Sequence, residues 1–144
     1  MFLSIAFAKK VFTTIVSYAI IIWVIKMSQN KDNFKRGTAE LLILHLLRKE
    51  DLYGYQITKL FNEKSKGEYT VLEGSIYPVL FRLVDAGYLS EYEQLVGAKR
   101  KRRYYHLEEA GKVYYRELLR EFDDTIYAIN SILDRTIGYS QNYA

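Results

Sequence analysis

The sequence predicts a mainly α-helical fold of α+β class, in which three short helices precede one β-hairpin and one long C-terminal helix. Apolar residues recur at helical spacing in four segments after residue 37. Between residues 90 and 107 a two-residue alternation replaces this spacing, with Gly97 near the expected turn. The only proline, Pro78, indicates a helix start nearby, because proline breaks helix interiors.

The composition is that of one globular domain. The chain has 144 residues, of which 49% are hydrophobic and 26% charged, so a buried core can form. It has no cysteine, which excludes disulfides, thiol nucleophiles and cysteine-ligated zinc. His45 and His106 are far apart in sequence and are expected to be structural. The acidic pairs at 108–109 and 123–124 are adjacent, and neighbours on a helix point about 100° apart. We therefore expect no enzyme, no cofactor and no metal site.

The first two helices are predicted at residues 38–50 and 55–64. Five leucines between residues 41 and 47 give an apolar density that strand alternation does not explain. Thr38 is a suitable N-cap for the first helix. Residues 51–54 are predicted to form a turn, and residues 69–72 an extended linker or a short edge strand.

The third helix is predicted to begin at Gly74 or Ser75, with Ser75 as its cap and Pro78 in its first turn. Gly87 is suited to the left-handed residue that follows a helix. One face is apolar and is expected to join the core, with Ile76, Val79, Leu80 and Leu83. Ser75 and Arg82 fall on another face and Tyr77 toward the flank, and these three side chains are left for a partner.

Five consecutive basic residues lie near the tip of the predicted hairpin. Such a run resists burial and repels itself, so a fold that keeps it together usually presents it to a polyanion. Helices followed by a basic hairpin predict a winged helix-turn-helix, in which a recognition helix enters the DNA major groove. The basic residues would neutralise phosphates, and the third helix would read bases. The wing residues predicted to contact DNA are Lys99, Arg100, Lys101, Arg102, Arg103 and Tyr104.

The last helix is predicted over residues 108–137 and carries an apolar stripe at spacings of three and four. The stripe could pack on its own domain. A helix this long would outrun so small a core, however, so we favour a contact between two copies of the chain. The predicted interface residues are Tyr115, Leu118, Phe122, Ile126, Ile129 and Leu133.

Several blocks of the chain resemble the PadR-type winged-helix transcriptional regulators. The matching blocks follow one another in the same order as in that family: GTAELLIL from residue 37, YGYQI from residue 53, EGSIYPVL from residue 73, and RYYHL from residue 103. The resemblance covers roughly residues 34–133, and the single C-terminal helix is similar to the shorter subgroup of the family.

The resemblance implies a homodimer that binds a palindromic operator in double-stranded DNA and represses transcription. By position, Ser75, Tyr77 and Arg82 would lie on the recognition helix and the run from Lys99 at the wing tip. Phe81 stands where a basic residue is common in the family. A small-molecule effector is possible but unidentified, and whether the regulator represses or activates stays open.

Residues 1–26 differ from the rest of the chain. Residues 11–25 are almost wholly apolar and are bounded by Lys10 and Lys26, which makes a marginal membrane span. One interpretation is a mis-assigned start, with Met27 as the true initiator and a cytoplasmic protein. The alternatives are a membrane anchor, which would make a membrane-tethered DNA-binding sensor, or a helix buried in a dimer. A protein-interaction module without DNA specificity is a further alternative for the whole chain.

Overall fold

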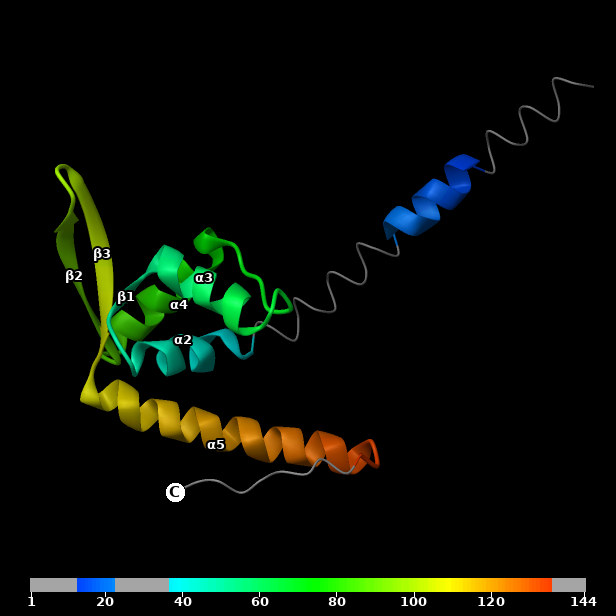
Figure 1. Cartoon of the computed structure of the whole chain (residues 1–144). Coiled ribbons are helices and arrows are strands. Elements are labelled where there is room, and N and C mark those ends of the chain that lie inside the picture. The colour runs from blue at the N-terminus through cyan, green and yellow to red at the C-terminus, as the bar shows by residue number, and fades with distance from the viewer. Residues whose placement is uncertain (1–12, 23–36, 136–144) are drawn as a thin grey trace, which may run out of the picture. The chain divides into compact units, whose positions relative to one another are not determined.

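The computed structural model describes residues 13–22 and 37–135 (Figure 1). The chain divides into two compact units, residues 1–38 and 39–144, which are considered separately. In the first unit residues 13–22 are helical and their side chains are exposed. Within the described residues no helix is both long and apolar enough to cross a bilayer. The rest of the predicted 1–26 segment lies outside the described residues.

The second unit is a winged helix-turn-helix with a long C-terminal helix, which confirms the predicted fold class. Figure 1 shows the β2–β3 hairpin projecting from the helices, and α5 running alongside α2. The elements are, in order, α2 (Ala39–Leu47), β1 (Leu52–Tyr53), α3 (Gly54–Lys64), α4 (Glu73–Asp85), β2 (Leu89–Val96), β3 (Arg100–Leu107) and α5 (Glu109–Ile132).

The sheet has three antiparallel strands in the order β1-β3-β2. β3 pairs with β2 from Leu89↔Leu107 to Val96↔Arg100, which confirms the predicted hairpin. β1 was not predicted, because the sequence there indicated only a turn. It is two residues long, too short for an alternation to be visible, and it forms by pairing Leu52 and Tyr53 with Tyr105 and Tyr104 of β3.

The core lies where α2, β1, α3 and α4 meet. The predicted buried face of α4 is confirmed, with Ile76, Leu80 and Leu83 at 1% exposure or less and Val79 partly buried. Burial of these side chains is the main force that holds the helices together. The largest fully buried side chains of the described chain are Ile43, Leu44, Leu52, Ile57, Ile76, Leu80 and Leu83.

The start of α4 corrects the sequence prediction. The helix begins at Glu73, two residues before the expected cap, and Leu72 is its N-cap. Ser75 lies inside the first turn, where its hydroxyl donates to the Leu72 carbonyl at 2.7 Å. Pro78 therefore lies within the helix and not in its first turn. The helix accommodates the missing amide donor of Pro78 because packing of its apolar face outweighs local propensity.

The end of α4 agrees with the prediction and leads directly to the attachment of α5. Gly87 adopts a left-handed φ of 76°, and the amide of Tyr88 donates to the Leu83 carbonyl at 2.9 Å. The carbonyl of Tyr88 then accepts from the amide of Glu108 at 3.1 Å. Gly111 of α5 packs against the same carbonyl, since a Cβ built at Gly111 would lie 2.2 Å from the Tyr88 oxygen.

Tyr115 is buried in the chain's own core, which corrects its predicted place in a dimer interface. Its side chain is 4% exposed and packs against α2. Arg48 lies over its ring at 4.8 Å and donates to its hydroxyl at 3.2 Å. That hydroxyl is 2.8 Å from Nδ1 of His45, whose pKa is lowered by burial and by the charge of Arg48. This hydrogen bond joins α2 to α5.

Two helical glycines give opposite predictions for stability. Gly111→Ala is expected to lower the free energy of unfolding by about 1–3 kcal/mol, because the new methyl group meets the Tyr88 backbone and cannot be accommodated without a shift. Gly74→Ala is the matched control, since nothing lies within 4 Å of its built Cβ. It should leave stability unchanged or raise it by up to about 1 kcal/mol. Urea denaturation monitored by circular dichroism measures both values, and equal losses would contradict the predicted close approach.

Candidate nucleic-acid interface

The three side chains predicted to read DNA are all exposed on α4, but they do not lie together. Ser75 and Arg82 are seven residues apart, two helical turns, and so share one side of the helix. Burial raises the pKa of the Tyr114 phenol on α5, and the charge of Arg82 opposes this rise. Tyr77 lies on the other flank, beside the wing. The exposed side of α4 between them carries Phe81, which is 73% exposed.

Tyr77 is held by contacts at the start of α3 and α4. Its hydroxyl donates to Oε1 of Glu73, one turn earlier, at 2.8 Å. Its ring lies against Gly54, where a Cβ would come within 2.8 Å of the phenol oxygen. The hydrogen bond to the carboxylate, followed by burial, raises the pKa of Tyr77 to about 12. Tyr77 is therefore a fixed, protonated hydroxyl at neutral pH.

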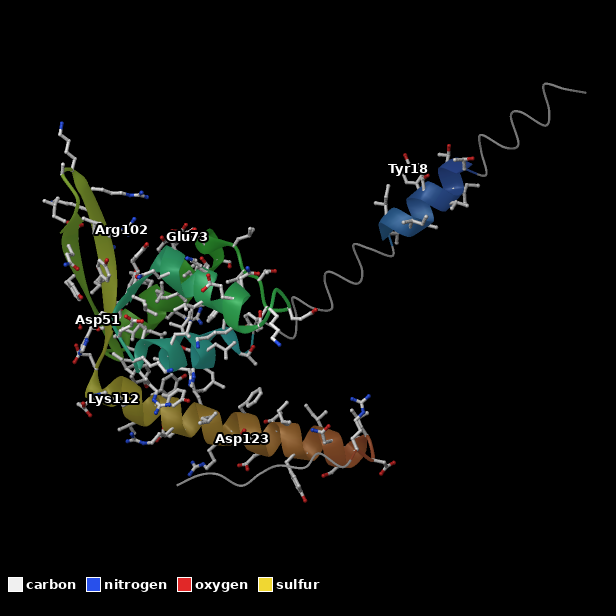
Figure 2. All side chains as sticks on the ribbon, viewed as in Figure 1. Tyr18, Asp51, Glu73, Arg102, Lys112 and Asp123 are labelled. Atoms are coloured by element: carbon white, nitrogen blue, oxygen red, sulfur yellow. The ribbon has the colours of Figure 1, made fainter. Side chains whose placement is uncertain are left out.

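A cleft of about 400 Å³ separates the starts of α3 and α4 from the wing. In Figure 2 the labelled Arg102 stands on the wing, and the labelled Glu73 stands at the start of α4. Among the residues that line the cleft, four are cations and only Glu73 is acidic, so the cleft favours an anion. The lining consists of Tyr53, Gly54, Tyr55, Glu73, Tyr77, Arg100, Lys101, Arg102 and Arg103.

Strand geometry divides the basic run between two faces of the wing. Lys99 lies in the turn that begins with Gly97, whose φ is 67°. Along β3, Lys101 and Arg103 share the face of Tyr105, and both approach carboxylates on β2. The Lys101 ammonium is 3.5 Å from Glu93, and the Arg103 guanidinium is 3.5 Å from Glu91 and 4.0 Å from Glu93. Part of the wing's positive charge is thus balanced within the wing.

The other face of the wing carries a row of tyrosine rings. Tyr92 stacks on Tyr104 at 5.7 Å, Tyr104 meets the edge of Tyr53 at 5.4 Å, and Tyr53 stacks on Tyr55 at 6.4 Å. The guanidinium of Arg102 lies 4.3 Å from the centre of the Tyr53 ring. Tyr104, a predicted DNA contact, is therefore part of this row and partly buried. Tyr53 was missed, because only the unpredicted strand β1 brings it to the wing.

Asp51 ties the base of the wing to the turn before β1. Its carboxylate accepts from the Tyr92 hydroxyl at 2.9 Å and lies 2.7 Å from Nδ1 of His106. His106 and His45 thus both contact side chains of the fold, as expected of structural histidines. Across the described ranges no three acidic or histidine side chains gather as a metal site would require.

The side chains of the predicted dimer stripe become more exposed along α5. Leu118 is partly buried against the chain's own core. Beyond it the helix extends past the core, and Phe122, Ile129 and Leu133 are 37%, 41% and 52% exposed. Ile126 is of intermediate exposure on the same side. An exposed apolar stripe at this spacing is typical of a helix that packs against another helix.

The fold and the basic wing define a winged-helix regulator, and comparisons identify its family. The profile of the transcriptional regulator PadR-like family matches residues 43–117, and the chain belongs to this family. It is similar to the structure of a transcriptional regulator from Clostridium thermocellum, with 31% identity and a TM-score of 0.65 over 69% of this chain and 96% of that one.

Two further comparisons involve Bacillus subtilis PadR. The chain is 37% identical over 70 residues to the protein described as negative transcriptional regulator PadR, covering 49% of this chain and 38% of that protein. It therefore spans less than half the length of that relative. It is also similar to a crystal structure of B. subtilis PadR in complex with operator DNA, with 34% identity and a TM-score of 0.52 over 56% of this chain and 45% of that one.

The hydrogen bond between Tyr77 and Glu73 predicts a titration that can be observed directly. In protein labelled with ¹³C at the tyrosine ζ carbon, the Tyr77 resonance should titrate with a pKa of about 12, against an ordinary value of 10.0. Glu73→Ala removes the main cause of the shift and should bring this pKa back toward the ordinary value. Glu63→Ala, a carboxylate on α3 that pairs with Lys59, is the control and should leave the Tyr77 titration unchanged.

Proposed function

We propose that the protein is a sequence-specific DNA-binding repressor that acts as a homodimer on a palindromic operator. The observation that carries this proposal is the cationic cleft between the starts of α3 and α4 and the wing. A winged helix that places its recognition helix in the major groove brings such a cleft against the phosphate backbone. One B. subtilis relative is described as a negative transcriptional regulator, and a structure of B. subtilis PadR contains operator DNA. Both descriptions support repression through operator binding.

In this proposal residues 34–107 bind DNA, and the two flanks of α4 have different roles. Tyr77, Arg100 and Arg102 line the cleft and contact the backbone. Ser75 and Arg82, on the other side of α4, face base edges in the groove. The Ser75 hydroxyl donates its hydrogen bond to the Leu72 carbonyl, so the Ser75 oxygen is left to act as an acceptor toward DNA. Arg82 is a donor that can bind guanine with two hydrogen bonds.

The homodimer is proposed from the distal half of α5, within residues 108–137. Its exposed apolar side has no partner in the described part of the chain, and the matching half of a second copy would cover it. A two-fold dimer places two recognition helices on one face of the duplex, and its symmetry requires a palindromic site. The same symmetry doubles the number of phosphate contacts and so strengthens the dependence on salt.

Two sets of substitutions separate charge neutralisation from base reading. Duplexes selected from a random library supply the operator, and scrambled duplexes of equal length serve as the comparison. Alanine at residues 99–103 should weaken binding to both. It should lower the salt slope by roughly 3 for each protomer, and so by roughly 6 for the dimer, because Lys101 and Arg103 are already paired with carboxylates and contribute little. Arg82→Ala should lose about 1–3 kcal/mol on the selected duplex with little change on the scrambled one. Unchanged binding in both variants would contradict the proposal.

Introducing charged side chains into the apolar stripe of α5 tests the proposed homodimer. Phe122→Glu and Ile129→Glu place carboxylates in the proposed interface and should convert the dimer to a monomer by light scattering. The fold should survive, because both side chains are partly exposed within one chain. Tyr127→Glu is the matched control, since Tyr127 is 69% exposed and lies off the stripe. A dimer that persists in both stripe variants would move the interface elsewhere.

A further inference from the structure

The structure assigns to Tyr53 a role that its sequence position does not indicate. We propose that Tyr53 is a positioning residue that holds Arg102 for contact with one phosphate of the DNA backbone in the cleft between α3, α4 and the wing. The proposal rests on the proposed DNA-binding function and deepens it, because it divides the basic run into one anchored cation and its supporting charges.

The first step is the difference between Arg102 and its neighbours. Lys101 and Arg103 each have a carboxylate of β2 within ion-pair distance. Within residues 13–22 and 37–135 Arg102 takes part in no ion pair, and its Nε is shielded from solvent without a hydrogen bond. Arg102 is therefore a cation whose position is not set by an acid.

The second step is what sets that position. The guanidinium lies over the Tyr53 ring at 4.3 Å, within the range of a cation–π contact. A ring on the flat side of a guanidinium holds its orientation and leaves the in-plane N–H donors unused. A carboxylate partner would occupy those same donors. The contact with Tyr53 thus holds Arg102 without using the N–H donors of its two terminal nitrogens, which stay available to an anion.

The third step is the fixed position of Tyr53 itself. Its backbone pairs with Tyr104 across β1 and β3, and its ring contacts Tyr104 and Tyr55. Tyr53 is also the N-cap residue of α3, and its backbone amide donates to Oε1 of Gln56 at 3.2 Å. The ring that supports Arg102 is therefore joined both to the sheet and to α3, on two sides of the cleft.

The fourth step is the ligand. The cleft is large enough for a phosphate group, and its lining has four cations against the single acid Glu73. The Glu73 carboxylate accepts from Tyr77, so part of its charge is directed toward that hydroxyl. A guanidinium with free in-plane donors is suited to a phosphate, which offers two oxygens in matching geometry. A backbone phosphate carries no base identity, so this contact contributes affinity to every duplex.

A double-mutant cycle tests the coupling between the two residues. Tyr53→Leu removes the ring, Arg102→Met removes the cation, and each should weaken binding roughly three- to tenfold on selected and scrambled duplexes alike. The double variant should be no weaker than Arg102→Met alone, because the ring acts only through Arg102. Tyr53→Phe keeps the ring and should bind like the wild type. Arg103→Met, a cation already paired with Glu91, is the matched control and should lose less than Arg102→Met.

A chemical change in the DNA locates the phosphate. Single phosphates of the selected duplex are replaced in turn by uncharged methylphosphonates. The wild type should lose affinity at several positions. Arg102→Met and Tyr53→Leu should both lose the sensitivity at the same single position in each half-site while remaining sensitive at the others. Retained sensitivity at that position in Arg102→Met would overturn the proposal, as would additive losses in the cycle.

Two controls keep the outcomes distinct. Circular dichroism and thermal unfolding show whether Tyr53→Leu remains folded, and if it does not, Arg102→Lys provides the test. Lysine keeps the charge but lacks the flat guanidinium, so it should bind more weakly than the wild type, and equal binding would overturn the proposal. A wild-type protein that binds no selected duplex would instead remove the proposed function itself.

Discussion

Burial of Tyr105 and Leu107 determines the register of β3, and the placement of every cation on that strand follows from it. Both side chains face the core and are at most 4% exposed. Because side chains alternate along a strand, Lys101 and Arg103 must share their face, where β2 supplies glutamates, and Arg102 must take the opposite face, where β1 supplies Tyr53. A shift of one residue would exchange these environments. The core therefore decides which cation is paired and which is left for a ligand.

The same core joins the wing to the long helix. Leu89 and Leu107 are paired at the base of the hairpin, and the residues next to them meet through the amide of Glu108 and the carbonyl of Tyr88. Gly111 lets the first turn of α5 approach that carbonyl closely. On its other side α5 is held to α2 through Tyr115. A change in the direction of α5 would thus act on the base of the wing, so the proposed dimer contact would have a physical route to the proposed DNA-facing surface.

Much of this arrangement could be predicted from the sequence, and the exceptions have physical reasons. The helices and the hairpin are long enough for their apolar periodicity to show, and Gly87 ends α4 as its backbone freedom indicates. β1 has only two residues and exists through its pairing with β3, so local pattern could not reveal it or the role of Tyr53. The start of α4 was misplaced because Ser75 and Pro78 suit a helix start by propensity, whereas packing begins the helix at Glu73. Tyr115 follows the spacing of the α5 stripe, and spacing alone does not distinguish the chain's own core from that of a partner.

In the proposed binding mode, the two flanks of α4 give affinity and discrimination separate locations on one helix. Tyr77 and the cleft lie toward the wing, and Ser75 and Arg82 lie on the other side. A phosphate held by Arg102 would fix the distance between wing and backbone on the first side, since the ring of Tyr53 limits the motion of the guanidinium. With the backbone fixed there, the second side is the one directed toward base edges. Substitutions of Ser75 or Arg82 could then change the preferred operator without changing the charge that holds the duplex, because neither residue takes part in the cleft.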